Sequence, residues 1–96
     1  MPAVNFEIQW PDGQISSGYS PSTIIHDYLA EGVSYPLSDF MQRAESGLNA
    51  ASERVRTVYG YACSSAMDCL YILQQQAKKY PDPKGQITLL RMHQSP

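Results

Sequence analysis

The chain has 96 residues, 43% of them hydrophobic and 17% charged, so it is long enough for one domain with its own core and too short for two. Seven Lys and Arg against nine Asp and Glu leave a net charge of −2, which disfavours nucleic-acid binding because the general attraction to phosphate is missing. The apolar runs are too short to cross a membrane, and the N-terminus lacks the pattern of a signal peptide. We therefore expect a cytoplasmic protein that does not contact a membrane.

Residues 4–10 alternate apolar and polar side chains, which is typical of a strand with one buried face. Pro11-Asp12-Gly13 predicts a turn, and residues 15–19 predict a strand that returns beside the first. The start of the chain is therefore expected to form an antiparallel β-hairpin.

The register of this hairpin has two candidates. A type I turn with a glycine bulge sets Trp10 opposite Gln14 and turns Ile15 and Tyr19 to the polar face. We favour the other register because it keeps the apolar residues on one face. It pairs Trp10 with Ile15, Ile8 with Ser17, and Phe6 with Tyr19.

A short helix is predicted after the hairpin. Ser20-Pro21-Ser22 offers a serine cap and a proline in the first helical turn, where its missing N–H costs nothing. Gly32 suits the left-handed residue that ends such a helix. The apolar residues on one side of it are Ile24, Ile25, Tyr28 and Leu29.

Two longer amphipathic helices follow, each indicated by apolar residues spaced four and three apart. The first spans residues 37–58, with the stripe Leu37, Met41, Ala44, Leu48, Ala51, Val55 and Val58. The second begins at Ser65, which forms a capping box with Asp68, or at Ser64. Its stripe is Ala66, Leu70, Leu73, Ala77 and Tyr80. The short break between the two helices allows them to lie antiparallel.

Pro81-Asp82-Pro83-Lys84-Gly85 predicts a loop, and residues 86–92 predict a third strand, which we expect beside the first. Residues 93–96 are expected to fray. The predicted fold class is α+β, an antiparallel β-hairpin plus a C-terminal strand packed against three helices, two of them a long antiparallel pair. Residues 1–96 are expected to form a single domain.

Cys63 is the candidate catalytic residue, because it lies just before the second long helix. The free N–H groups at a helix start lower the pKa of a nearby thiol and stabilise the thiolate. A catalytic thiolate also needs a base, and the two histidines, His26 and His93, are far from it in the sequence. The alternative is a small buried residue, so that Cys63 and Cys69 are simply two reduced thiols.

The same joint between the helices suggests a small-anion site. Ser64, Ser65 and the first N–H groups of the second helix could hold a carboxylate or phosphate, with Arg54 or Arg56 as the countercharge. The two arginines are two residues apart and point to different sides of the helix, so at most one faces such a site. The alternative is that both pair with Glu53, with Asp68 or with solvent.

Tyr59 and Tyr61 are candidate interaction residues at this joint. Tyrosine is enriched at protein interfaces, although half-buried tyrosines are also normal at the surface of a domain. The histidines and cysteines lack the short ligand spacings of a zinc site, so we expect no metal and no cofactor. The sequence shows no phosphate-binding glycine loop and no nucleophile elbow, which disfavours an enzymatic function.

Six segments resemble a known small bacterial family. They are Trp10-Pro11-Asp12-Gly13, Tyr19-Ser20-Pro21-Ser22-Thr23, Asp27-Tyr28, Tyr35-Pro36-Leu37, Ala51-Ser52-Glu53-Arg54-Val55-Arg56 and Ala62-Cys63-Ser64-Ser65-Ala66. On these segments the chain resembles nitrogen-starvation response proteins encoded in a gene cluster with a nitrilase, a radical S-adenosylmethionine enzyme, an acetyltransferase-like protein and a flavin-dependent oxidoreductase. The resemblance brings no assigned reaction and no catalytic residues.

The resemblance implies a bacterial cytoplasmic protein of a nitrilase-linked nitrogen-starvation pathway. We expect an accessory or binding protein that contacts enzymes of the cluster, such as the nitrilase or the radical S-adenosylmethionine enzyme. The alternatives are a small enzyme or carrier that uses Cys63, or a small-anion-binding module. The unpaired edges of the second and third strands could also be covered in a homodimer.

Overall fold

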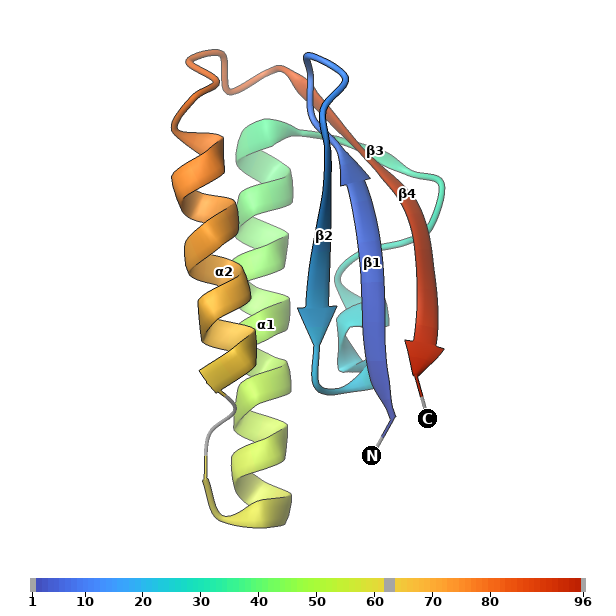
Figure 1. Cartoon of the computed structure of the whole chain (residues 1–96), viewed down its shortest axis with the longest axis vertical. Coiled ribbons are helices and arrows are strands. Elements are labelled where there is room, and N and C mark those ends of the chain that lie inside the picture. The colour runs from blue at the N-terminus through green and yellow to red at the C-terminus, as the bar shows by residue number, and fades with distance from the viewer. Residues whose placement is uncertain (1, 62–63, 96) are drawn as a thin grey trace.

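The computed structural model describes residues 2–61 and 64–95 and shows an α+β protein with a helical layer beside an antiparallel sheet (Figure 1). Over these residues the sheet has four strands in the order β2-β1-β4-β3, and the helical layer has two α-helices. The strands are β1 (Ala3–Gln9), β2 (Ile15–Ser20), β3 (Ser34–Pro36) and β4 (Gln86–Ser95). The helices are α1 (Leu37–Tyr59) and α2 (Ser64–Ala77), which run antiparallel as predicted.

The prediction of three helices is wrong. The segment after the hairpin forms only one short 3₁₀ turn, η1 (Thr23–Asp27), with Ser22 as its N-cap. The Ser22 side chain accepts a hydrogen bond from the Ile24 N–H, and Ile25 is buried below. Only two of the four apolar residues of the predicted helix, Ile24 and Ile25, lie within this turn. A single turn is too short for a stable α-helix.

The favoured register of the hairpin is also wrong. Gln9 lies opposite Ile15 and Phe6 opposite Gly18, so that Trp10 faces Gln14, and the Trp10 N–H donates to the Gln14 carbonyl at 2.7 Å. Gly13 has a φ of 93°, the left-handed conformation of a glycine bulge. Ile15 is therefore turned outward and is 59% exposed.

Packing explains this register. The face of β2 that points to the core carries only small residues, Ser16, Gly18 and Ser20. A Cβ atom at Gly18 would overlap the ring of Phe6, so the ring occupies the space that a larger residue would need. The bulky side chains of β1 fill the core, and the small residues of β2 leave the space that they occupy.

The third predicted strand lies beside the first, as expected. β4 pairs antiparallel with β1, and its register shifts between Glu7 and Ile8, where Leu90 forms a bulge. β4 continues to Ser95, beyond residue 93, where we expected the chain to fray. The three-residue strand β3, which the sequence analysis did not predict, pairs with the first part of β4.

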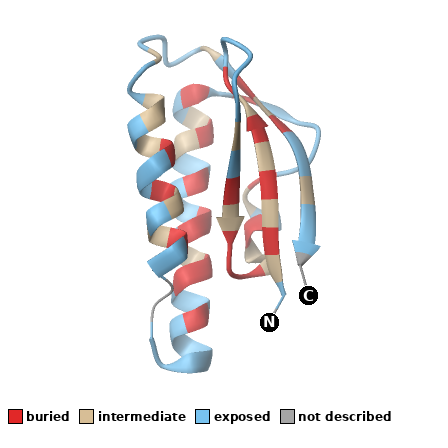
Figure 2. Ribbon diagram, in the orientation of Figure 1, coloured by how far each residue is buried: buried red, intermediate tan, exposed pale blue. Residues whose placement is uncertain are grey.

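The core lies between the sheet and the two helices (Figure 2). Both helical stripes face it, with Ala44, Leu48, Ala66 and Leu73 almost fully buried. Val58, the last residue of the first stripe, is 58% exposed, because α1 extends past the end of the sheet. The largest fully buried side chains are Trp10, Phe6 and Phe40.

Candidate functional site

Tyr59 and Tyr61 lie at the far end of the helix pair, where α1 stops. Gly60 ends the helix with a φ of 86°, and its N–H donates to the Arg56 carbonyl at 2.8 Å. The two tyrosine side chains are 52% and 68% exposed, and their ring centroids lie 6.4 Å apart. Cys63, the candidate nucleophile, lies outside the residues that the structure describes.

The four residues of the predicted anion site lie on different parts of the surface. Arg54 lines a shallow depression beside α1 together with Ile24, whereas Ser65 lines another between β2 and α2. Arg56 forms an exposed ion pair with Glu53 at 3.7 Å. Ser64 is exposed at the first residue of α2.

Asp68 lies beside Ser65 in its depression, and a carboxylate there opposes a bound anion. Arg54 and Ser65 line two separate depressions, and anion binding stays a prediction.

The depression between β2 and α2 holds the second thiol, which the sequence analysis did not single out. The Cys69 Sγ accepts a hydrogen bond from the Tyr19 N–H at 3.3 Å, and Asn5, Ser17 and Asp68 line the same hollow. Burial raises the pKa of the Cys69 thiol above its usual value, and the hydrogen bond from Tyr19 offsets only part of this rise. The thiol is therefore protonated at neutral pH and a poor nucleophile.

The hydrogen bond to Cys69 gives this residue a structural role. Tyr19 lies on β2, an edge strand, and its N–H points away from β1 because Asn5 and Tyr19 form a non-hydrogen-bonded pair of the ladder. Without Cys69 this N–H would have no partner in a half-buried position.

A second polar cluster joins the hairpin turn to the end of α2. The Trp10 Nε1–H donates to Ser16 Oγ at 2.8 Å, and the Ser16 hydroxyl donates to Gln76 Oε1 at 2.7 Å. The Tyr80 hydroxyl donates to Asp12 Oδ1 at 2.8 Å, and partial burial together with the Asp12 carboxylate raises the pKa of the Tyr80 phenol. These bonds hold the hairpin and the end of α2 together and leave no free base or nucleophile among the five side chains.

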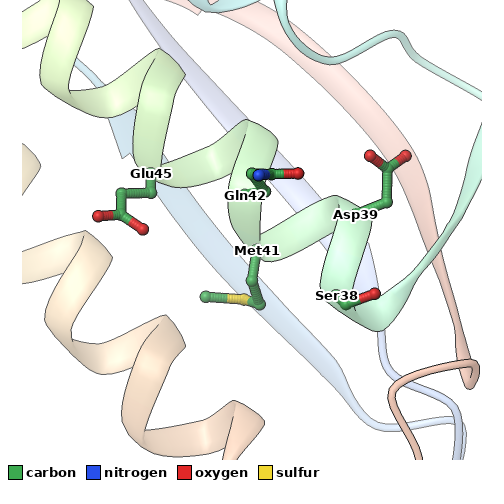
Figure 3. A pocket seen from close by; sticks show the side chains of 5 residues that line it. All are labelled: Ser38, Asp39, Met41, Gln42 and Glu45. Carbon is green, nitrogen blue, oxygen red and sulfur yellow. The ribbon is translucent and has the colours of Figure 1, made fainter.

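A shallow depression on the first half of α1 is formed by side chains from that helix alone (Figure 3). Met41 points toward α2, whereas Asp39 points to the opposite side. Asp39 is already paired with Arg43 at 3.0 Å, and the other charged residue that lines the hollow is Glu45. The depression does not provide a built binding site.

Within the described residues, no group of three or more His, Cys, Asp or Glu side chains could hold a metal ion. Neither α1 nor α2, as far as the structure describes them, is long and apolar enough to span a membrane. What the described surface does offer is exposed aromatic area at the end of the helix pair.

The fold and this surface define a small α+β protein in which a layer of two helices lies beside an antiparallel sheet. Comparison with known families assigns it more narrowly, since the family model described as nitrogen starvation-induced protein NitG matches residues 5–92. The chain belongs to the NitG family of nitrogen starvation-induced proteins. No curated protein and no solved structure shows significant similarity to it.

Proposed function

We propose that this chain is an accessory protein of the nitrogen-starvation response and that it acts by binding a partner enzyme through the end of the helix pair. The observation that carries this proposal is the cluster of exposed apolar and aromatic side chains Val58, Tyr59 and Tyr61, which we call the helix-end cluster. Buried aromatic anchors supply much of the binding energy at protein interfaces, so exposed tyrosines suit a contact surface.

The shape of the molecule supports this role. The longest dimension of the molecule is 39 Å, against 22 and 18 Å for the other two, and the end of α1 extends beyond the sheet (Figure 1). A protruding end can enter a concavity on a larger protein with little steric hindrance from the rest of the chain.

The charged residues beside the helix-end cluster fit the rim of an interface. Glu53, Arg54 and Arg56 are all exposed on the last turns of α1. Polar and charged residues commonly surround the apolar centre of a contact surface, and arginine is enriched there. The partners that we propose are the nitrilase and the radical S-adenosylmethionine enzyme that the family resemblance implies.

The test is direct binding of the purified chain to each enzyme, measured by biolayer interferometry. The double variant Tyr59→Ala/Tyr61→Ala should weaken binding by about 10-fold or more, as expected for loss of two interface aromatics. Tyr71→Ala is the matched control, because Tyr71 is 62% exposed but lies on α2, away from the helix-end cluster.

Two results would contradict the proposal. One is that neither enzyme binds the wild-type chain. The other is that Tyr71→Ala weakens binding as much as the double variant, which would place the contact on another surface. Circular dichroism and thermal unfolding check that both variants are folded.

A further inference from the structure

The edges of the sheet are protected unequally. On one side, α2 packs against the edge strand β2, and Cys69 accepts the hydrogen bond from the Tyr19 N–H. On the other side, β3 is only three residues long and ends at Pro36, which has no N–H to offer. Short edge strands, proline and covering helices are the usual means by which proteins prevent edge-to-edge pairing.

The second half of β4 has none of these protections. β3 pairs only with Gln86–Thr88, and the Leu89 N–H donates to the Val33 carbonyl at 2.9 Å. From Leu90 to Ser95 the described chain places no strand beside β4 on the side away from β1. In Figure 1 this half of β4 lies on the side of the molecule opposite α2.

The ladder shows which backbone groups face this open edge. Trp10 and Gln14 form a hydrogen-bonded pair, so the alternation along β1 turns the backbone groups of Asn5 and Glu7 toward β4. Their partners on β4 are His93 and Arg91. The N–H and C=O groups of the residues in between, Met92 and Gln94, therefore point outward.

We propose that this open half of β4, which we call the β4 edge, pairs antiparallel with the β4 edge of a second copy of the chain. A two-fold axis at His93 places Met92 of each copy opposite Gln94 of the other, and all four outward N–H and C=O groups of each such pair are then bonded. The sheets of the two copies become one continuous sheet. A strand edge is self-complementary across a two-fold axis, which is the symmetry of most homodimers.

Charge and packing favour a second copy of the chain as the partner of the β4 edge. Glu31 lines the same depression as Arg91 and His93, so this side of the molecule carries both signs of charge and presents no like-charge barrier to its own copy. Arg91 is also paired with Glu7 at 3.2 Å, which reduces the positive charge near the axis. Leu90 is 37% exposed beside the edge and adds apolar area to the contact.

Light scattering during size-exclusion chromatography tests the oligomeric state. The wild-type chain should give twice the 10.7 kDa of one copy at concentrations of about 10 to 200 µM, and the apparent mass should fall on dilution. Gln94→Pro removes an outward N–H without removing a bond to β1, so this variant should be monomeric. Gln94→Ala keeps the N–H and should remain a dimer. Thermal unfolding verifies that both variants are folded.

Cross-linking tests the register. Two residues that face each other across a non-hydrogen-bonded pair have Cα atoms about 4.5 Å apart, a spacing that a disulfide can bridge. His93→Cys should therefore give a disulfide-linked dimer on mild oxidation. Arg91→Cys is the control, because the two copies of residue 91 would lie about 13 Å apart along the strands. The two native cysteines are present in both variants and in the wild type.

Three outcomes would overturn the proposal. They are a monomeric wild-type chain, a dimer that persists in Gln94→Pro, or cross-linking of Arg91→Cys that equals that of His93→Cys. The double variant Tyr59→Ala/Tyr61→Ala should remain a dimer. The proposal for the β4 edge and the proposal for the helix-end cluster can therefore be contradicted independently.

Discussion

The indole of Trp10 lies flat against the phenol ring of Tyr80, with ring centroids 5.2 Å apart and planes 4° from parallel. Trp10 follows β1 and Tyr80 follows α2, so the stack joins the sheet layer to the helical layer at the hairpin end. Trp10 is only 1% exposed, which makes this contact part of the core. The hydrogen bond from Tyr80 to Asp12 extends the same junction to the turn.

Loss of the Tyr80 ring should destabilise the fold more than loss of its hydroxyl. Tyr80→Ala removes the stack and should lower the free energy of unfolding by about 2 kcal/mol, whereas Tyr80→Phe removes an exposed hydrogen bond and should cost less than about 1 kcal/mol. Urea unfolding followed by the emission of Trp10, the single tryptophan, measures both. Equal losses in the two variants would show that the stack contributes nothing beyond the hydroxyl.

Ser16→Ala should have a larger effect than a surface serine substitution. The Ser16 hydroxyl accepts from the buried Trp10 indole and donates to Gln76, so alanine leaves both groups without this partner. We expect a loss of about 1 to 3 kcal/mol in the free energy of unfolding. Ser17→Ala, at the exposed neighbouring position, should change it by less than about 0.5 kcal/mol. Similar losses at the two positions would contradict this role for Ser16.

Gly18→Ala should destabilise the fold through its contact with Phe6. The added Cβ would overlap the Phe6 ring, which is 1% exposed and has little room to move, so we expect a loss of about 3 kcal/mol. Combining it with Phe6→Leu should cost less than the sum of the two single changes, because the smaller side chain frees the space. Additive losses in denaturant unfolding would argue against the overlap.

Cys69 should react slowly with iodoacetamide. Its pKa is raised by burial, so its thiolate fraction at pH 8 is smaller than that of a free thiol. Peptide mapping by mass spectrometry separates its labelling rate from that of Cys63. The rate in the native protein should rise only at a pH above the free-thiol value, and in urea it should reach that of an exposed thiol. Rapid native labelling at pH 7 would contradict the raised pKa.

Tyr80 should make the fold sensitive to alkaline pH. Its pKa is raised in the folded state, so the contribution of its neutral form is complete below about pH 10 and is lost as the pH rises through the folded value. Tyr80→Phe cannot ionise at this position and should lose less stability than the wild type as the pH rises above about 10. Thermal unfolding at stepped pH compares the two, and parallel curves would refute the effect.

The register of β2 in the hairpin does not follow from its sequence pattern. The core face of this strand carries Ser16, Gly18 and Ser20, and its outer face carries Ile15 and Tyr19. The apolar pattern therefore favours the wrong face. The register follows instead from the room that the Phe6 ring requires, and no local spacing encodes that requirement.

The candidate sites depended on the structure in the same way. The sequence predicted that Tyr59 and Tyr61 lie at a joint between helices, because the apolar spacing of α1 stops before them. It did not predict the contact between Cys69 and the Tyr19 N–H, since these residues are fifty positions apart. A thiol that covers a strand edge leaves no signature along the chain.

The sequence by itself determined β1, the two long helices and the strand that follows them, because a buried face repeats every two residues in a strand and every 3.6 in a helix. It also placed the last strand beside the first. Only the tertiary structure decided the hairpin register, the added strand β3, and which strand edges are left open. These features depend on the volumes and backbone groups that distant segments bring together, and periodicity within one segment carries no information about them.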